Sequence, residues 1–193
     1  SYGDLLDAYG TSTSSANTHY FEYGVSEGRS FDNFDETSYL ASHSDLLGAY
    51  GSNTTSALNH YIEYGYSEGR ILDKFNEFSY IASHSDLITS IGADGEAGTA
   101  HYVNTGYAAG KATDTFDEFG YIASHSDLIG SIGSDAVAGA KHFITTGYAE
   151  GRSVTFDASL YLARHADVRA AYGNDEELAK QHYINHGFDE GRV

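Results

Sequence analysis

The nine residues YIASHSDLI occupy Tyr80–Ile88 and recur without change at Tyr121–Ile129. Two variants keep the same spacing, YLASHSDLL at Tyr39–Leu47 and YLARHADVR at Tyr161–Arg169. A stretch that returns at a fixed interval indicates a tandem-repeat architecture, so the period has to be established before any motif inside it is interpreted.

The period is 41 residues, except for a last interval of 40. Basic residues mark the unit ends at Arg29, Arg70, Lys111, Arg152 and Arg192. The chain therefore divides into a partial unit at 1–29 and full units at 30–70, 71–111, 112–152 and 153–193, which we expect to form one continuous stack. The partial unit starts in mid-pattern, because Asp4 matches Asp45, and we expect it to be a portion of a longer array.

The pattern of capping and apolar residues in each full unit predicts three short α-helices. In the first full unit, Asp35 caps one helix, Ser44 or Asp45 caps a second, and a third runs from the cap Asn53 to Gly65. Helices this short are marginal alone in water, so each must be held by its neighbours. The sequence predicts an all-α tandem-repeat helical solenoid with about three short helices per unit. Phenylalanines open the full units and are expected to plug the preceding ones: Phe34, Phe75, Phe116 and Phe156.

The composition excludes several classes of partner. There are 28 acidic and 10 basic residues, a formal net charge of −18, and no cysteine. Nucleic acid and anionic membranes require cationic patches, and no apolar run approaches the length of a membrane span. Neither nucleic-acid binding nor membrane insertion is therefore expected, and we predict neighbouring repeats or copies of the chain itself as partners.

The recurring His-Ser-Asp raises the hypothesis of a hydrolase. Adjacent residues in a helix point about 100° apart, so His43, Ser44 and Asp45 do not converge as a catalytic triad does. The middle serine is also replaced by Ala166 in the last unit. We predict that the chain is not an enzyme and has no catalytic residues.

The aspartate of this trio is present in all five copies, beginning with Asp4. At the first turn of a helix it faces free backbone N–H groups and the positive end of the helix dipole, and its expected side-chain partner is the arginine that ends the unit. Calcium is the alternative, although one carboxylate per unit falls short of the six to eight oxygens that calcium takes. The structural positions are Asp45, Asp86, Asp127 and Asp167 for the carboxylates and Arg70, Arg152 and Arg192 for the arginines.

Histidine occupies two positions per full unit, seventeen residues apart. The second set is predicted to be packed and structural: His60, His101, His142 and His182. The first set is the candidate for zinc or another transition metal: His43, His84, His125 and His165. The competing interpretation is a packed ring that hydrogen-bonds a backbone carbonyl or a neighbouring hydroxyl, and we expect no cofactor.

Tyrosines gather around the end of the third helix, at Tyr23, Tyr64, Tyr66, Tyr107 and Tyr148. Aromatic rings beside carboxylates are typical of sugar-binding platforms and also of ordinary half-buried packing. Surface polysaccharide therefore remains a candidate partner.

The whole unit, Y-[LI]-A-S-H-x-D-L-I followed by H-Y-x-x-x-G-x-x-E-G-R, resembles repeats of large secreted or surface proteins of bacteria, of the haemolysin-type calcium-binding or S-layer-like kind. The resemblance implies a secreted or cell-surface location. It implies a non-enzymatic structural or adhesive module of a larger surface protein, with a ligand-binding module holding repeated calcium or polysaccharide sites as the alternative. The glycine- and aspartate-rich nonapeptides that bind calcium in such proteins are missing here.

Overall fold

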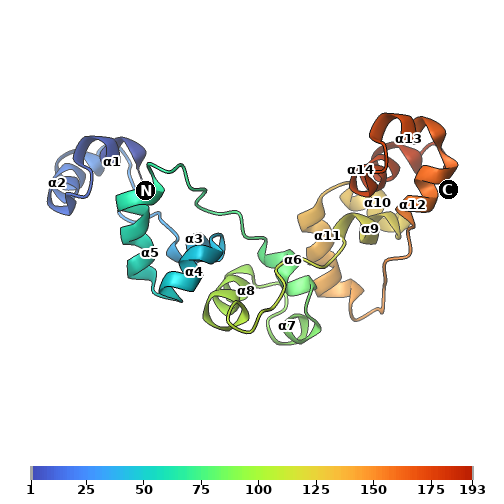
Figure 1. The fold of residues 1–193 in the computed structure, drawn as a ribbon, viewed down its shortest axis with the longest axis horizontal. Helices are drawn as coiled ribbons and strands as arrows, with labels where there is room; N and C mark the ends of the chain where they lie inside the picture. The colour runs from blue at the N-terminus through green and yellow to red at the C-terminus, as the bar shows by residue number, and fades with distance from the viewer. Residues whose placement is uncertain (1, 193) are drawn as a thin grey trace. The chain divides into compact units, whose positions relative to one another are not determined.

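The computed structural model describes residues 2–192, which form helices and turns without a strand (Figure 1). The predicted class is confirmed: the chain is an all-α tandem helical repeat in which similar helix pairs recur. Each full repeat contributes three α-helices, and a five-residue π-helical segment extends the third one. The partial repeat contributes the second and third helices and the π segment.

The elements recur in the same order along the chain. The first helices are α3 (Glu36–Ala41), α6 (Glu77–Ala82), α9 (Glu118–Ala123) and α12 (Ala158–Arg164). The second helices are α1 (Gly3–Tyr9), α4 (Ser44–Tyr50), α7 (Ser85–Ser90), α10 (Ser126–Ile132) and α13 (Ala166–Tyr172). The third helices are α2 (Thr13–His19), α5 (Thr54–His60), α8 (Gly95–His101), α11 (Ala136–His142) and α14 (Glu176–His182). The π segments are η1 (Tyr20–Gly24), η2 (Tyr61–Gly65), η3 (Tyr102–Gly106), η4 (Phe143–Gly147) and η5 (Tyr183–Gly187).

The predicted caps are confirmed for the first and third helices. Asp35 accepts a hydrogen bond from the Ser38 N–H at 2.8 Å, and Asn53 accepts one from the Ser56 N–H at 3.0 Å. The prediction for the second helix is wrong: His43 holds the N-cap position without a side-chain cap bond, and Ser44 already begins the helix. Ser44 and Asp45 both lie inside the first turn of the helix, one residue beyond the cap position, and the carboxylate of Asp45 is bound by an arginine, as described below.

The predicted end of the third helix at Gly65 is confirmed, because η2 ends there, and a hydrogen-bonded turn follows it. In this turn the Tyr66 N–H donates to the Tyr61 carbonyl and the Arg70 N–H to the Gly65 carbonyl, both at 2.9 Å and both with a five-residue spacing. The left-handed residue that terminates this turn is Gly69, with φ of +66°. Gly65 is glycine for another reason, namely the close approach of a tyrosine hydroxyl.

The core of each repeat is built around the tyrosine of its first helix. Tyr39 is fully buried, together with Leu40 and the leucines of the second helix. Phe34 stacks on Tyr61 with ring centroids 4.8 Å apart. The phenylalanine at the start of a repeat therefore packs against the π segment of the same repeat. The equivalent tyrosines are buried to the same degree: Tyr80, Tyr121 and Tyr161.

The chain forms two compact units, one of residues 1–75 with 99–111 and the other of residues 76–98 with 112–193. In the second unit, α11 packs on α9 of its own repeat and on α6 of the preceding one, and α14 packs in the same way on α12 and α9. A third helix therefore covers the first helices of two successive repeats.

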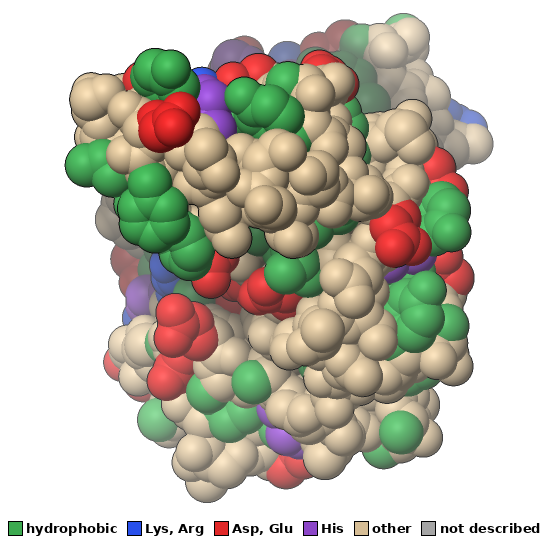
Figure 2. All heavy atoms as spheres, turned by 90° about the vertical axis from the view of Figure 1, so that its left-hand side faces the viewer, with side chains coloured by type: hydrophobic (Ala, Val, Ile, Leu, Met, Phe, Trp, Pro, Cys, Tyr) green, Lys and Arg blue, Asp and Glu red, His purple; other side chains and the backbone are tan. Residues whose placement is uncertain are grey.

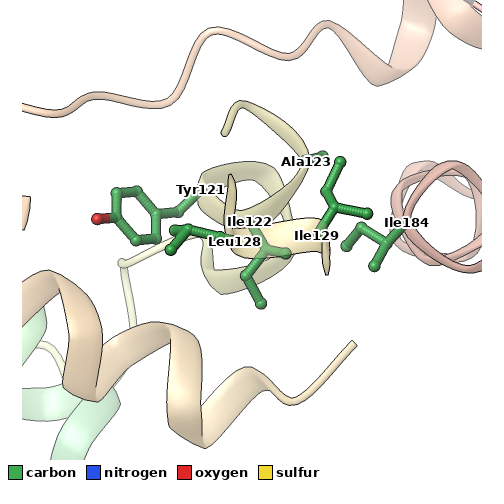
Figure 3. Close-up of a cluster of buried hydrophobic side chains, with 6 residues drawn as sticks. All are labelled: Tyr121, Ile122, Ala123, Leu128, Ile129 and Ile184. Atoms are coloured by element: carbon green, nitrogen blue, oxygen red, sulfur yellow. The ribbon is translucent and has the colours of Figure 1, made fainter. Parts of the chain in front are cut away.

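The side chains that meet where a third helix packs on the first helix of the preceding repeat come from both repeats. Ile184, from η5, faces Ile129 in the cluster around Tyr121 (Figure 3). Phe156 packs against this cluster as well as against the core of its own repeat, so for this phenylalanine the predicted closing of the preceding repeat is confirmed. The buried Lys180 adds a polar contact, with Nζ 2.8 Å from the Asp117 carboxylate of the preceding repeat.

Candidate functional site: the joint between repeats

The A-S-H-S-D stretch lies where one repeat meets the next. Its first serine binds backbone N–H groups at the start of the following repeat. The hydroxyl oxygen of Ser42 accepts hydrogen bonds from the backbone N–H groups of Lys74 and Phe75, at 2.8 and 3.2 Å. Ser83 accepts from Thr115 and Phe116 at 2.8 and 3.1 Å. Ser124 accepts from Thr155 and Phe156 at 2.7 and 2.9 Å.

The histidine binds the first carbonyl of the same incoming segment. The Nε2–H of His43 donates to the carbonyl of Ile71 at 2.9 Å, and that of His84 donates to the carbonyl of Ala112 at 2.8 Å. The His43 ring also packs edge-on against Tyr39, with centroids 4.8 Å apart. Burial of the ring disfavours its charged form and lowers the pKa of His43.

The joint between the third and fourth full repeats departs from this pattern. His125 faces the backbone of Ser153, but its buried Nε2 lacks a partner that satisfies hydrogen-bond geometry among the described residues. The link to Phe156 is one residue shorter here than in the earlier units, which accounts for the different placement of that carbonyl. Burial again lowers the pKa of His125.

The aspartate binds the arginine that ends its own repeat, next to the joint. Arg70, the last residue of its repeat, places Nη1 2.8 Å from Asp45 and Nε 2.7 Å from Glu68. The predicted pairing of this aspartate with the arginine is confirmed here and in three further copies. They are Arg29–Asp4, Arg152–Asp127 and Arg192–Asp167. The hydrogen bond from Arg152 lowers the pKa of Asp127.

The histidines of the third helix bind a hydroxyl inside their own repeat. The Tyr39 hydroxyl and Nδ1 of His60 share a hydrogen bond of 3.0 Å, between the first and third helices. The same bond joins Tyr121 to His142 and Tyr161 to His182, both at 2.9 Å. His101 stands at the same repeat position.

Burial has opposite effects on the two partners in this bond. In the Tyr161–His182 pair it raises the pKa of Tyr161 to about 12 and lowers the pKa of His182, because the neutral form of each side chain is favoured away from water. The Tyr39 hydroxyl also approaches the Cα of Gly65 so closely that a Cβ at that position would collide with it.

The three side chains of the His-Ser-Asp sequence thus face three different surroundings. The Nε2 of His43 is bonded to a carbonyl, the carboxylate of Asp45 is bonded to an arginine, and Ser44 between them is exposed. The arrangement does not assemble a nucleophile with a base, which requires the side chains to contact one another.

Among residues 2–192, no group of three or more histidine, aspartate or glutamate side chains is placed to hold a metal ion. His43 and His84, from the candidate metal-binding set, direct Nε2 at carbonyl oxygens of the joint. His165 has a buried Nε2 without a hydrogen-bond partner in the described part of the chain.

The sequence analysis missed Ser42, Ser83 and Ser124, which make the most regular contacts of the joint. These serines could have been found by comparing the four full units of this sequence position by position. The serine precedes the histidine in the first three full units, and Arg164 takes its place in the fourth.

Comparison with protein-family models, with curated proteins and with solved structures finds no match to this chain. Within the described residues, none of the helices combines the length and the apolar character needed to cross a membrane.

Proposed function

We propose that the chain is a non-enzymatic structural module, a spacer or adhesive segment built from stacked repeats within a larger secreted or surface protein. One observation carries this proposal. The polar side chains that the repeats have in common bind the backbone, an arginine or a tyrosine of the repeat array itself. Ser42, His43 and Asp45 are all occupied in this way.

The surface chemistry supports the same role. Acidic side chains are scattered over the face that carries α1 and α2, with hydrophobic side chains between them and few basic ones (Figure 2). A net charge of −18 keeps such a module soluble and repels other acidic chains. This favours a spacer that is joined to its neighbours along the polypeptide.

The test is the dependence of size on repeat number. Chains ending after the second, third and fourth full repeats should increase in maximum dimension by a constant increment in small-angle X-ray scattering. Calcium at millimolar concentration should leave these dimensions unchanged. A dimension that does not grow with repeat number, or one that changes on addition of calcium, would contradict the spacer function.

Two serine variants at the joint between the third and fourth full repeats provide a matched comparison. Replacing Ser124 with alanine removes the acceptor for the Thr155 and Phe156 N–H groups and should increase the spread of dimensions in the four-repeat chain. Replacing the exposed Ser126 should leave the dimensions unchanged.

Binding of surface polysaccharide is a second candidate function, favoured by exposed aromatic rings in the first two π segments. Tyr23 and Tyr64 are 55 % and 54 % exposed, and each follows a glutamate, Glu22 or Glu63. An exposed aromatic face beside a carboxylate suits stacking and hydrogen bonding to a sugar. A glycan array probed with the chain and with the Tyr23→Ala, Tyr64→Ala double variant tests this function, which predicts signals lost in the variant.

A further inference from the structure

The fourth full repeat carries a histidine that the other repeats do not have. Its third helix, α14, ends at His182, and η5 continues the helix through His186, four residues later. The other repeats have tyrosine or threonine at this position, namely Tyr23, Tyr64, Thr105 and Thr146. His186 is therefore not part of the pattern that the repeats share.

The rings of His182 and His186 lie next to each other, with centroids 5.6 Å apart. Side chains four residues apart are neighbours on the surface of a helix. The same position places the Tyr64 ring 5.8 Å from the His60 ring in the first full repeat, so the backbone of the π segment sets this proximity. In the fourth repeat the neighbouring ring is a second imidazole. Two histidines at this spacing on a helix present two metal ligands to one ion.

A hydrogen bond from the core orients one histidine of the pair. Nδ1 of His182 lies 2.9 Å from the hydroxyl of Tyr161, which is 2 % exposed. The ring of Tyr172 packs against the same imidazole, with centroids 5.8 Å apart. When Nδ1–H donates to the hydroxyl oxygen, the other ring nitrogen, Nε2, presents a lone pair. Metal-binding histidines are held by an outer bond of this kind, which fixes their tautomer and orientation.

The second histidine and the nearby charges suit the approach of a cation. His186 is exposed, so its ring is free to turn toward an ion. The charges that act on His182 include Arg192 and the two carboxylates bound to it, Glu190 and Asp167. Two carboxylates outweigh one guanidinium, and the chain as a whole carries a net charge of −18. A negative field attracts a divalent cation.

We propose that His182 and His186 form a binding site for a divalent transition-metal ion that prefers imidazole ligands, such as Zn²⁺, Ni²⁺ or Cu²⁺. Nε2 of His182 and a ring nitrogen of His186 are the two protein ligands, and water completes the coordination. Calcium does not suit the site, because it takes oxygen ligands. The bound ion links α14 to η5 and, through Tyr161, to α12. This site is independent of the spacer function, and neither one depends on the other.

The test is titration of the full chain with zinc chloride by isothermal titration calorimetry. We expect one ion per chain, and an unfolding midpoint that rises by about 5 °C or more when zinc exceeds its dissociation constant about a hundredfold. EDTA should reverse the rise. The matched variant is His186→Thr, which introduces the residue of the second and third full repeats and leaves the Tyr161 bond intact. It should bind zinc at least about tenfold more weakly, and unchanged affinity would overturn the proposal.

The third full repeat offers the reciprocal variant. His142 bonds to the Tyr121 hydroxyl at 2.9 Å, as its counterpart does in the fourth repeat, and Thr146 stands four residues later. Thr146→His should therefore create a second site and raise the stoichiometry from one ion to two. A stoichiometry that stays at one would show that the paired histidines are not sufficient, and would overturn the assignment.

Nitrogen NMR identifies the ligands. Zinc should shift the Nε2 resonance of His182 and a ring nitrogen of His186, and should leave the rings of His43 and His84 unchanged. Tyr161→Phe removes the oxygen that orients His182 and should weaken zinc binding about tenfold. Shifts at His43 and His84 in place of the pair, or shifts spread over all the histidines as for an adventitious ion only, would overturn the proposal.

Discussion

The hydroxyl of Tyr39 lies 3.0 Å from Nδ1 of His60 and directly over the Cα of Gly65, at the place where a Cβ would stand. One side chain of the first helix thus contacts both ends of the π segment that follows the third helix. The equivalent glycines Gly147 and Gly187 lie under Tyr121 and Tyr161 in the same way. The relationship explains why a glycine with ordinary helical backbone recurs in the middle of a helical turn.

Gly65→Ala should destabilise the chain by about 1–3 kcal/mol, because the new methyl group forces the Tyr39 hydroxyl aside. Tyr39→Phe alone should cost about 1 kcal/mol for the lost hydrogen bond to His60. In the double variant the hydroxyl that collides is gone, so the total should be less than the sum of the two single effects. Denaturant unfolding of all four proteins measures this coupling, and strictly additive values would contradict it.

Ser124→Ala should reduce stability by about 1 kcal/mol, because the N–H groups of Thr155 and Phe156 lose their acceptor. The exposed Ser126 is the control, and its replacement by alanine should change stability by less than about 0.5 kcal/mol. Chemical denaturation distinguishes the two variants. An effect at Ser126 equal to that at Ser124 would contradict the role of the Ser124 hydroxyl, and ester hydrolysis that disappears in Ser126→Ala would support the hydrolase hypothesis.

Asp45→Asn should weaken the joint only modestly, by less than about 1 kcal/mol, because the carboxylate is largely exposed and its attraction to Arg70 is screened by water. The sensitive readout is salt dependence. Raising the salt concentration to about 1 M should lower the stability of the original chain relative to that of the variant, since the variant keeps the Arg70–Glu68 pair but has no Asp45–Arg70 pair to screen. Equal salt sensitivity of the two proteins would argue against a contribution of the pair.

Stability should fall as the pH is lowered from neutral. Burial lowers the folded-state pKa of His43, His125 and His182 below the value of about 6.5 expected in the unfolded chain. The unfolded chain therefore binds more protons in this range. The stabilisation is complete above about pH 6.5 and is lost as the pH falls through the lowered folded values.

The control for this pH dependence is His43→Gln, which keeps an N–H donor for the Ile71 carbonyl but does not titrate. The free energy of unfolding of this variant should depend less on pH, by the share that the His43 ring contributes in the original chain. Denaturation at a series of pH values, repeated with EDTA and with added zinc or calcium, measures both. Stability that stays constant or rises toward pH 5 would contradict the neutral, buried rings, and a zinc-dependent gain would indicate a metal site.

Ile184→Ala should cost about 2–5 kcal/mol, because the residue is 5 % exposed and belongs to a core of the preceding repeat (Figure 3). Leu178→Ala on the same repeat is the control, since that side chain is 40 % exposed. Hydrogen exchange should show reduced protection in α9 and α10 as well as in α14. Loss of protection confined to the fourth repeat would mean that the repeats unfold independently.

The period, the helical class and most of the caps could be predicted from the sequence because they depend on local chemistry. An aspartate or asparagine before an apolar helical pattern satisfies backbone N–H groups whatever the tertiary structure, as Asp35 and Asn53 do. The pairing of Asp45 with Arg70 was also predictable, because basic residues are so few in the first two units.

The tertiary structure alone decided where His43, Ser42 and Tyr39 act, since each binds a group more than twenty residues away in the sequence. The place of the tyrosine hydroxyl over Gly65 is decided in the same way, because it cannot be inferred from neighbours in the chain. Local propensity set the helices, and packing between segments distant in the sequence set which side chains join one repeat to the next.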